Sequence, residues 1–172
     1  GVTAADSNMK AGTWQRIMGR RLSEITVGVV GVGRIGKLVI RHLVNGFPGV
    51  GILANDLEPD TAFGKDHGVT WVEKDALYAD VDIVTIHVPL TPLTRGLIGG
   101  AEMAFMKPAA SLINTARGDI IDEADLAAAL EAGTIAAAAI DVFEREPYTG
   151  DLVGLENCLL TSHMGPMSED CR

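Results

Sequence analysis

The sequence predicts a doubly wound α/β fold, in which a mostly parallel sheet carries helices on both faces. Short runs of β-branched residues alternate with longer runs of helical periodicity over most of the 172 residues. Three of the short runs, residues 27–30, 83–86 and 112–113, are almost entirely apolar and do not alternate with polar residues. Such runs are typical of parallel strands that are buried on both sides.

The start of the chain shows this alternation in order. Residues 1–24 are polar and mixed, and we expect them to form a helical lead-in. The β-branched run at 25–30 predicts the first strand. Apolar residues at helical spacing from Ile35 onward then predict a helix that ends at Gly46.

Two further strands are expected at residues 51–55 and 69–72. No helix is predicted between them, and His67 is assigned to a polar loop. A helix over 73–79 and a strand over 81–86 continue the alternation.

The second half of the chain is predicted to repeat these units. A short helix over 102–106 precedes a strand over 110–114. Aspartate is a common N-cap residue, so we expect a helix that begins at Asp122 and runs to Ala132. The last strand is expected at 158–161.

The segment at residues 135–140 is ambiguous. Its four alanines favour a helix by intrinsic propensity. However, the run has only six residues and follows a helix stop at Gly133. We therefore expect a strand.

The composition excludes several classes of function. Asp and Glu number 23 against 14 Lys and Arg, which gives a net charge of −9 and argues against a nucleic-acid groove. No apolar run approaches the roughly 18 residues of a membrane span, and no secretory leader is visible. Cys158 and Cys171 are too few for a disulfide scaffold, so we expect a cytoplasmic protein. No metal site is expected.

A glycine-rich turn separates the first predicted strand from the first predicted helix. Residues 31–36 read Gly-Val-Gly-Arg-Ile-Gly and match the G-x-G-x-x-G pattern of dinucleotide-binding proteins. Gly31 would permit a tight turn, Gly33 would let a pyrophosphate approach the backbone, and Gly36 would let helix and strand pack closely. The alternative is an ordinary strand–helix turn.

An acid follows the second predicted strand. Asp56 lies about 20 residues after Gly36, where a carboxylate binds the ribose hydroxyls of NAD and repels the 2′-phosphate of NADP. The next residue is Leu57 rather than an arginine, which also favours NAD. The alternative is a solvated loop acid, because Glu58 and Asp60 are neighbours.

Arg117, Glu146 and His163 each follow a predicted strand. Ligands of doubly wound sheets bind beyond the carboxyl ends of the strands, so we expect these residues to converge. Arg117 can hold a carboxylate with two parallel hydrogen bonds, and His163 can exchange the hydroxyl proton of a 2-hydroxy acid. Glu146 can orient the imidazole. Each also has an ordinary alternative: Arg117 could be a surface turn residue, Glu146 an acid of a charged loop, and His163 a structural histidine.

At these residues the chain resembles the D-isomer-specific 2-hydroxyacid dehydrogenases, the family that includes D-3-phosphoglycerate dehydrogenase. The resemblance covers nearly the whole chain in order. Its motifs lie at residues 27–36, 87–94, 106–108, 114–118, 141–147 and 161–165.

This resemblance implies a Rossmann-type fold, NAD as the cofactor, and Arg117, Glu146 and His163 as the catalytic residues. It also implies that Arg34 and Ile35 meet the pyrophosphate. The remaining residues that it implies at the cofactor, together with Arg117 and His163, are Gly31, Gly33, Gly36, Asp56, Val88, Pro89, Thr115, Ala116, Asp141 and Gly165.

Family members also have a substrate-binding domain, which we expect to be absent from this chain. Residues 25–172 would form the NAD-binding domain, and residues 1–24 would contact the missing domain and a second copy in a homodimer. The implied substrate is a small 2-hydroxy acid or the corresponding 2-keto acid. Ser162 departs from the family, because many members have proline before the histidine.

Two other functions fit parts of the pattern. A non-enzymatic NAD-sensing protein, like the co-repressors that resemble this family, could keep all three strand-end residues. A methyltransferase also has a glycine-rich turn and an acid after the second strand. However, it has no role for Arg117, Glu146 and His163.

Overall fold

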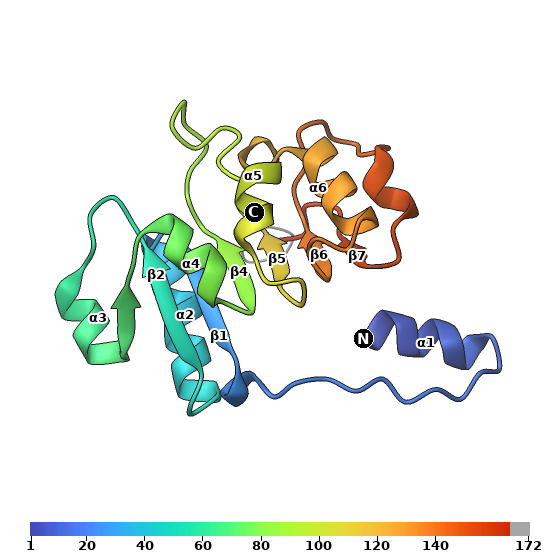
Figure 1. Cartoon of the computed structure of the whole chain (residues 1–172), viewed down its shortest axis with the longest axis horizontal. Coiled ribbons are helices and arrows are strands. Elements are labelled where there is room, and N and C mark those ends of the chain that lie inside the picture. The colour runs from blue at the N-terminus through green and yellow to red at the C-terminus, as the bar shows by residue number, and fades with distance from the viewer. Residues whose placement is uncertain (166–172) are drawn as a thin grey trace.

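The computed structural model describes residues 1–165, so Cys171 lies outside the described residues. The centre of the fold is one seven-stranded sheet in which all neighbouring strands are parallel. The strands are β1 Thr26–Val30, β2 Gly51–Asn55, β3 Val69–Trp71, β4 Ile83–Ile86, β5 Ser111–Asn114, β6 Ala137–Ile140 and β7 Cys158–Leu160. Their order across the sheet is β3-β2-β1-β4-β5-β6-β7 (Figure 1).

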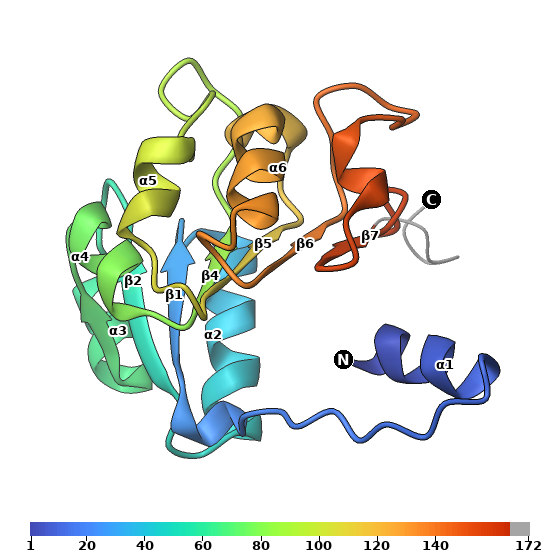
Figure 2. The ribbon, with the colours of Figure 1, turned by 45° about the vertical axis from the view of Figure 1, so that its right-hand side comes forward.

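Helices cover both faces of this sheet (Figure 2). The α-helices are α1 Val2–Lys10, α2 Arg34–Gly46, α3 Thr61–His67, α4 Lys74–Asp80, α5 Gly100–Phe105 and α6 Glu123–Glu131, and the 3-10 helices are η1 Leu22–Glu24, η2 Gly118–Ile120 and η3 Asp151–Gly154. One buried cluster contains Ile40 and Phe63 from α2 and α3. The other contains Leu77, Met103 and Leu126 from α4, α5 and α6. The predicted doubly wound fold is confirmed.

The chain changes direction across the sheet between β1 and β4. From β1 it proceeds to β2 and β3, and it then returns so that β4 pairs with the other side of β1. The loops that leave the two strands therefore run to opposite sides and open a crevice. The glycine-rich turn follows β1 at this switch point, and the loop that begins at His87 follows β4.

Most of the predicted elements are present with small shifts of their bounds. The strand expected at 81–86, for example, begins at Ile83. The ambiguous alanine segment is strand β6, as expected, and the buried Ala138 pairs in register with Leu112 of β5 and Cys158 of β7. Packing inside the sheet thus outweighs the helix propensity of alanine here.

The expectation of a polar loop around His67 is wrong, because residues Thr61–His67 form α3. The Asp60 carboxylate caps this helix by accepting a hydrogen bond from the Phe63 N–H, and Gly68 ends it with a φ of 66°. The His67 ring stacks on Phe63 with 4.1 Å between the ring centroids. Two capping residues, rather than a long apolar period, encode this helix.

Residues 1–21 form an arm that extends away from the sheet (Figures 1 and 2). Of the expected lead-in over 1–24, only α1 and η1 are helical. No residue of α1 is buried, and Trp14 and Met18 are 76% and 91% exposed. Arg20 ties the arm to the body, since its Nη1 donates a 2.8 Å hydrogen bond to Asp82 Oδ1. Within residues 1–165, no helix combines the length and apolarity needed to cross a bilayer.

Candidate active site

The glycine-rich turn leaves room for a ligand at one of its three glycines. Gly31 has a φ of 90°, in the left-handed region that favours glycine. A Cβ on Gly36 would collide with the carbonyl oxygen of Gly31, whereas a Cβ on Gly33 would meet no atom within 4 Å. Helix α2 begins at this open space without a side-chain cap, so its first N–H groups can bind an anion.

Asp56 lies directly beside this turn. Its Oδ2 accepts a 2.6 Å hydrogen bond from the Val32 N–H, and its Oδ1 accepts a 3.0 Å bond from the Glu58 N–H. Leu57, between the two acids, is 89% exposed. The carboxylate therefore stabilises the glycine-rich turn.

A cavity of about 610 Å³ opens over Gly33 at the switch point. Its walls come from the start of α2 and from the loops that follow β4 and β5. The structure brings eight predicted cofactor residues together here and adds His87 and Leu90, to which the sequence assigns no role at the cofactor. The lining residues are Gly33, Arg34, Ile35, His87, Val88, Pro89, Leu90, Thr115, Ala116 and Arg117.

His87 contributes an uncharged ring to this cavity. Burial lowers the pKa of its imidazole, and its Nε2 lies 3.1 Å from the Thr85 hydroxyl. The cationic side chains that line the cavity are therefore Arg34 and Arg117. Both suit the negative charge of a dinucleotide or a carboxylate.

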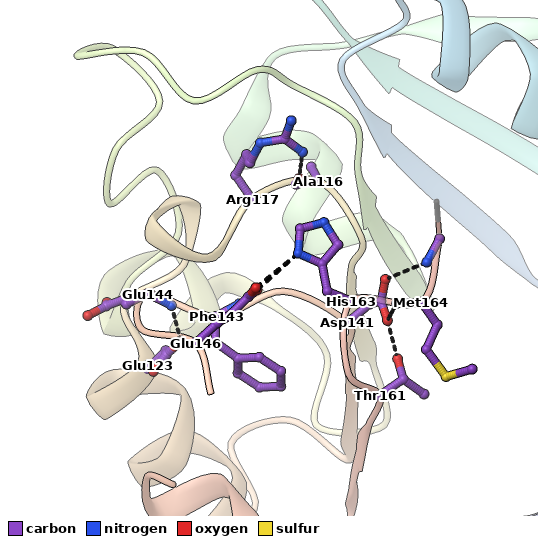
Figure 3. A network of polar contacts seen from close by, with 11 residues as sticks. Ala116, Arg117, Glu123, Asp141, Phe143, Glu144, Glu146, Thr161, His163 and Met164 are labelled. Carbon is purple, nitrogen blue, oxygen red and sulfur yellow. Dashed lines mark hydrogen bonds and ion pairs between the residues drawn. The ribbon is translucent and has the colours of Figure 1, made fainter. Parts of the chain in front are cut away.

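His163 and Glu146 form a hydrogen-bonded pair between the loops that follow β7 and β6. His163 Nδ1 lies 3.1 Å from Glu146 Oε2 and 3.2 Å from Oε1 (Figure 3). The bond from His163, together with one from the Phe143 N–H, holds the pKa of Glu146 below its ordinary value. A carboxylate at Nδ1 favours the tautomer that carries its proton there, which leaves Nε2 free to accept a proton.

Asp141 holds the loop that carries His163. Its buried carboxylate accepts hydrogen bonds from the Thr161 hydroxyl (2.5 Å), the Met164 N–H (2.9 Å) and the Gly165 N–H (3.3 Å). Its carbonyl oxygen accepts a bond from the His163 N–H, and His163 has an uncommon φ of 53°. Burial alone would raise the pKa of Asp141, but these hydrogen bonds outweigh burial and lower it.

Arg117 lies on the loop after β5 and is exposed. Its Nη1 donates a 2.6 Å hydrogen bond to the Ala116 carbonyl oxygen. The buried Asn114 shapes this loop, because it accepts a hydrogen bond from the Ala116 N–H and donates one to the Arg117 carbonyl oxygen. In the close view, Arg117 lies on the side to which the second nitrogen of His163 points (Figure 3).

The His163–Glu146 pair lines a second cavity, of about 830 Å³, and not the cavity over Gly33. Most of the other walls of this second cavity are apolar, namely Phe143, Pro147, Tyr148, Val153, Leu160 and Met164. In the part of the chain that the structure describes, no three His, Cys, Asp or Glu residues are grouped to hold a metal ion.

Comparison with known proteins agrees with this geometry. Residues 1–165 match the family model described as D-isomer specific 2-hydroxyacid dehydrogenase, NAD binding domain. The chain is 38% identical to D-3-phosphoglycerate dehydrogenase of Archaeoglobus fulgidus over 99% of its own length and 33% of that protein.

Two solved structures are similar to the fold. One is an NAD-complexed D-isomer specific 2-hydroxyacid dehydrogenase from Lactobacillus delbrueckii ssp. bulgaricus, with a TM-score of 0.86 and 29% identity over 98% of this chain and 56% of that chain. The other, from Xanthobacter autotrophicus Py2, is a complex with NADPH and MES; the TM-score is 0.84 and the identity 33% over 95% of this chain and 52% of that chain.

The chain thus spans about a third of the curated relative and about half of each solved structure. All three relatives are named dehydrogenases, so neither the co-repressor-like alternative nor the methyltransferase is favoured. The family match covers every described residue and includes the glycine-rich turn and the three strand-end residues. This chain belongs to the NAD-binding domain family of the D-isomer specific 2-hydroxyacid dehydrogenases.

Proposed function

We propose that this chain forms the cofactor-binding part of an enzyme that interconverts a small D-2-hydroxy acid and its 2-keto acid. The observation that carries this proposal is the His163–Glu146 pair, with 3.1 Å between Nδ1 and Oε2. The loops of this pair leave the same sheet as the glycine-rich turn and Arg117. An acid–base group, a carboxylate-binding cation and a dinucleotide site are the components that this reaction requires.

Each of the three strand-end residues has a defined role in the proposed reaction. During oxidation the C2 hydrogen leaves as a hydride, and Nε2 of His163 takes the hydroxyl proton; during reduction His163 returns it. Glu146 keeps the imidazole in the required tautomer. Arg117 holds the substrate carboxylate through paired hydrogen bonds. When bound, NAD supplies the nicotinamide carbon that accepts or donates the hydride.

The residues at the switch point fit a dinucleotide. The open space over Gly33 and the uncapped start of α2 can receive the pyrophosphate, with Arg34 and Ile35 beside it. In our proposal Asp56 binds the ribose and disfavours NADP. The adenosine would lie against Val88 and Pro89, and the nicotinamide end would lie near Thr115, Ala116, Arg117, Asp141, His163 and Gly165.

We also propose a domain and partner arrangement. Residues 25–172 would be the NAD-binding domain, and residues 1–24 would contact the substrate-binding domain and a second copy in a homodimer. The exposed Trp14 and Met18 support a partner for this segment. We propose a cytoplasmic location, in keeping with the two cysteines of the sequence. Burial raises the pKa of the Cys158 thiol to about 11, and within residues 1–165 this thiol pairs with no other cysteine.

The proposed activity is tested on a protein that contains this chain together with the proposed substrate-binding domain. We expect NADH-dependent reduction of at least one 2-keto acid in a panel that contains pyruvate, glyoxylate and phenylpyruvate. His163→Gln should lower kcat by about 10²-fold or more, because it removes the acid–base group. His42→Gln is the matched control, since His42 is exposed on α2. A folded wild-type protein that reduces no 2-keto acid would contradict the proposal.

A further inference from the structure

Two backbone segments of the site touch directly. The buried Gly118 follows Arg117, and it packs against Phe143 and Glu144. A Cβ on Gly118 would overlap the carbonyl carbon of Phe143 and the nitrogen of Glu144, so the approach requires glycine. The loop that presents Arg117 is therefore in contact with the loop that presents Glu146.

Glu123 fastens the Glu146 loop from a second direction. It is the first residue of α6, and its Oε1 accepts a 2.7 Å hydrogen bond from the Glu144 N–H (Figure 3). Helix α6 is itself fixed, since Asp122 caps it and Leu126 and Leu130 are buried in the larger core cluster. The Glu146 loop is thus held to a rigid element that contributes no catalytic group.

The surroundings of Glu123 do not otherwise favour a carboxylate. Burial raises its pKa, and the nearby charges of Glu144, Asp119 and Asp122 raise it further. Asp119 is in turn paired with Arg95. The bond from the Glu144 N–H is the interaction that favours the ionised form.

We propose that Glu123 is a positioning residue for the acid–base pair. By holding the Glu144 N–H it fixes residues 142–147, so that Glu146 accepts hydrogen bonds from both the Phe143 N–H and His163. This inference rests on the proposed function, which gives the pair its chemical role.

The test follows the titration of the Glu146 carboxyl in the 172-residue chain by NMR, with ¹³C-labelled glutamate. Glu146→Gln identifies the signal, and His163→Gln measures how far the pKa of Glu146 rises when its partner is lost. Glu123→Ala removes the contact. Glu123→Gln keeps an oxygen that can accept from the Glu144 N–H but removes the charge, and Glu123→Asp keeps the charge but shortens the side chain.

We expect Glu123→Ala and Glu123→Asp to raise the pKa of Glu146 by an amount comparable to that in His163→Gln, and Glu123→Gln to leave it near the wild-type value. Loss of charge alone acts in the opposite direction, because removing a neighbouring carboxylate favours ionisation of Glu146. Glu131→Ala, at the exposed far end of α6, is the matched control and should titrate like the wild type.

Provided that His163→Gln raises the pKa of Glu146, three results would overturn the positioning role of Glu123. The first is an unchanged pKa of Glu146 in Glu123→Ala and Glu123→Asp. The others are a fall of this pKa in both Glu123→Ala and Glu123→Gln, and an equal rise in all three Glu123 variants. An unchanged pKa in His163→Gln would instead contradict the acid–base pair, and with it the proposed function.

Discussion

Asp141 is the residue that receives the most hydrogen bonds in the site. We expect Asp141→Asn to lower the free energy of unfolding by about 1–3 kcal/mol. Both carboxylate oxygens of Asp141 accept hydrogen bonds, from the Met164 N–H and the Gly165 N–H, and the NH₂ group that replaces one oxygen in asparagine cannot accept one. Urea unfolding measures this change. Asp66→Asn, on the exposed face of α3, should have little effect.

The stabilising effect of Asp141 is expected to depend on pH. Hydrogen bonds lower the folded-state pKa of Asp141 below its unfolded value of about 3.9, even though its burial opposes them. Its stabilisation is therefore complete above the unfolded pKa and is lost as the pH falls through the folded pKa. The stability difference between wild type and Asp141→Asn should be constant above about pH 5 and should shrink below about pH 4. A difference that grows on acidification would contradict this assignment.

The close contact of Gly118 with the Phe143 backbone can be tested by substitution. Gly118→Ala should lower the free energy of unfolding by about 1–3 kcal/mol, since the new methyl group overlaps the backbone of Phe143. Gly46→Ala is the control, because a Cβ there meets no atom within 4 Å and the residue is helical. It should stabilise the protein by up to about 1 kcal/mol. Equal effects of the two variants would refute the close contact at Gly118.

For single residues, the sequence predicts which side chains carry reactive groups better than it predicts which residues hold them in position. Glu146 and His163 both follow strands of one parallel sheet, so their contact could be inferred from topology. The convergence of Arg117 with this pair stays a prediction. Gly118 acts through the close approach of two loops, and Glu123 acts through a hydrogen bond from the start of α6 to one of those loops. No periodicity or spacing in the sequence encodes either contact. The hydrogen bonds of Asp141 to its neighbours are likewise a property of loop conformation.

Among the elements, the unit of β1, the glycine-rich turn and α2 allows effects on stability to be distinguished from effects on cofactor binding. Gly33→Val should change the free energy of unfolding by less than about 0.5 kcal/mol, because its Cβ enters open space. It should weaken NADH binding by at least about tenfold, because the side chain occupies the approach to the start of α2. Thermal unfolding and a calorimetric titration measure the two effects. Unaltered NADH affinity would place the pyrophosphate elsewhere.

The elements also show what sequence patterns can and cannot predict. β6 was predictable in spite of its alanines, because its length and the preceding helix stop favour a strand. The spacing of apolar residues does not predict α3, because seven residues give almost no helical period. The signals of α3 in the sequence are its two end residues, the N-cap Asp60 and the left-handed Gly68.

At the scale of the whole molecule, the arm of residues 1–21 predicts association. Trp14 and Met18 are exposed on a segment that Arg20 attaches to the body. We expect sedimentation equilibrium to show a dimer, and Trp14→Ser combined with Met18→Ser to shift it toward the monomer. Leu93→Ser removes an apolar side chain that is 79% exposed on another loop and should leave the dimer intact. A wild-type chain that stays monomeric at all concentrations would exclude pairing through the arm.

Binding of NAD at the switch point of the sheet is the basis of the proposed function. A calorimetric titration of the chain with NADH, repeated with NADPH, tests it most directly. We expect NADH to bind more tightly than NADPH. We also expect Asp56→Asn to narrow the difference between the two affinities, because it keeps an acceptor for the Val32 N–H but removes the charge. A wild-type chain that is folded by circular dichroism and binds neither nucleotide would contradict NAD binding at the switch point.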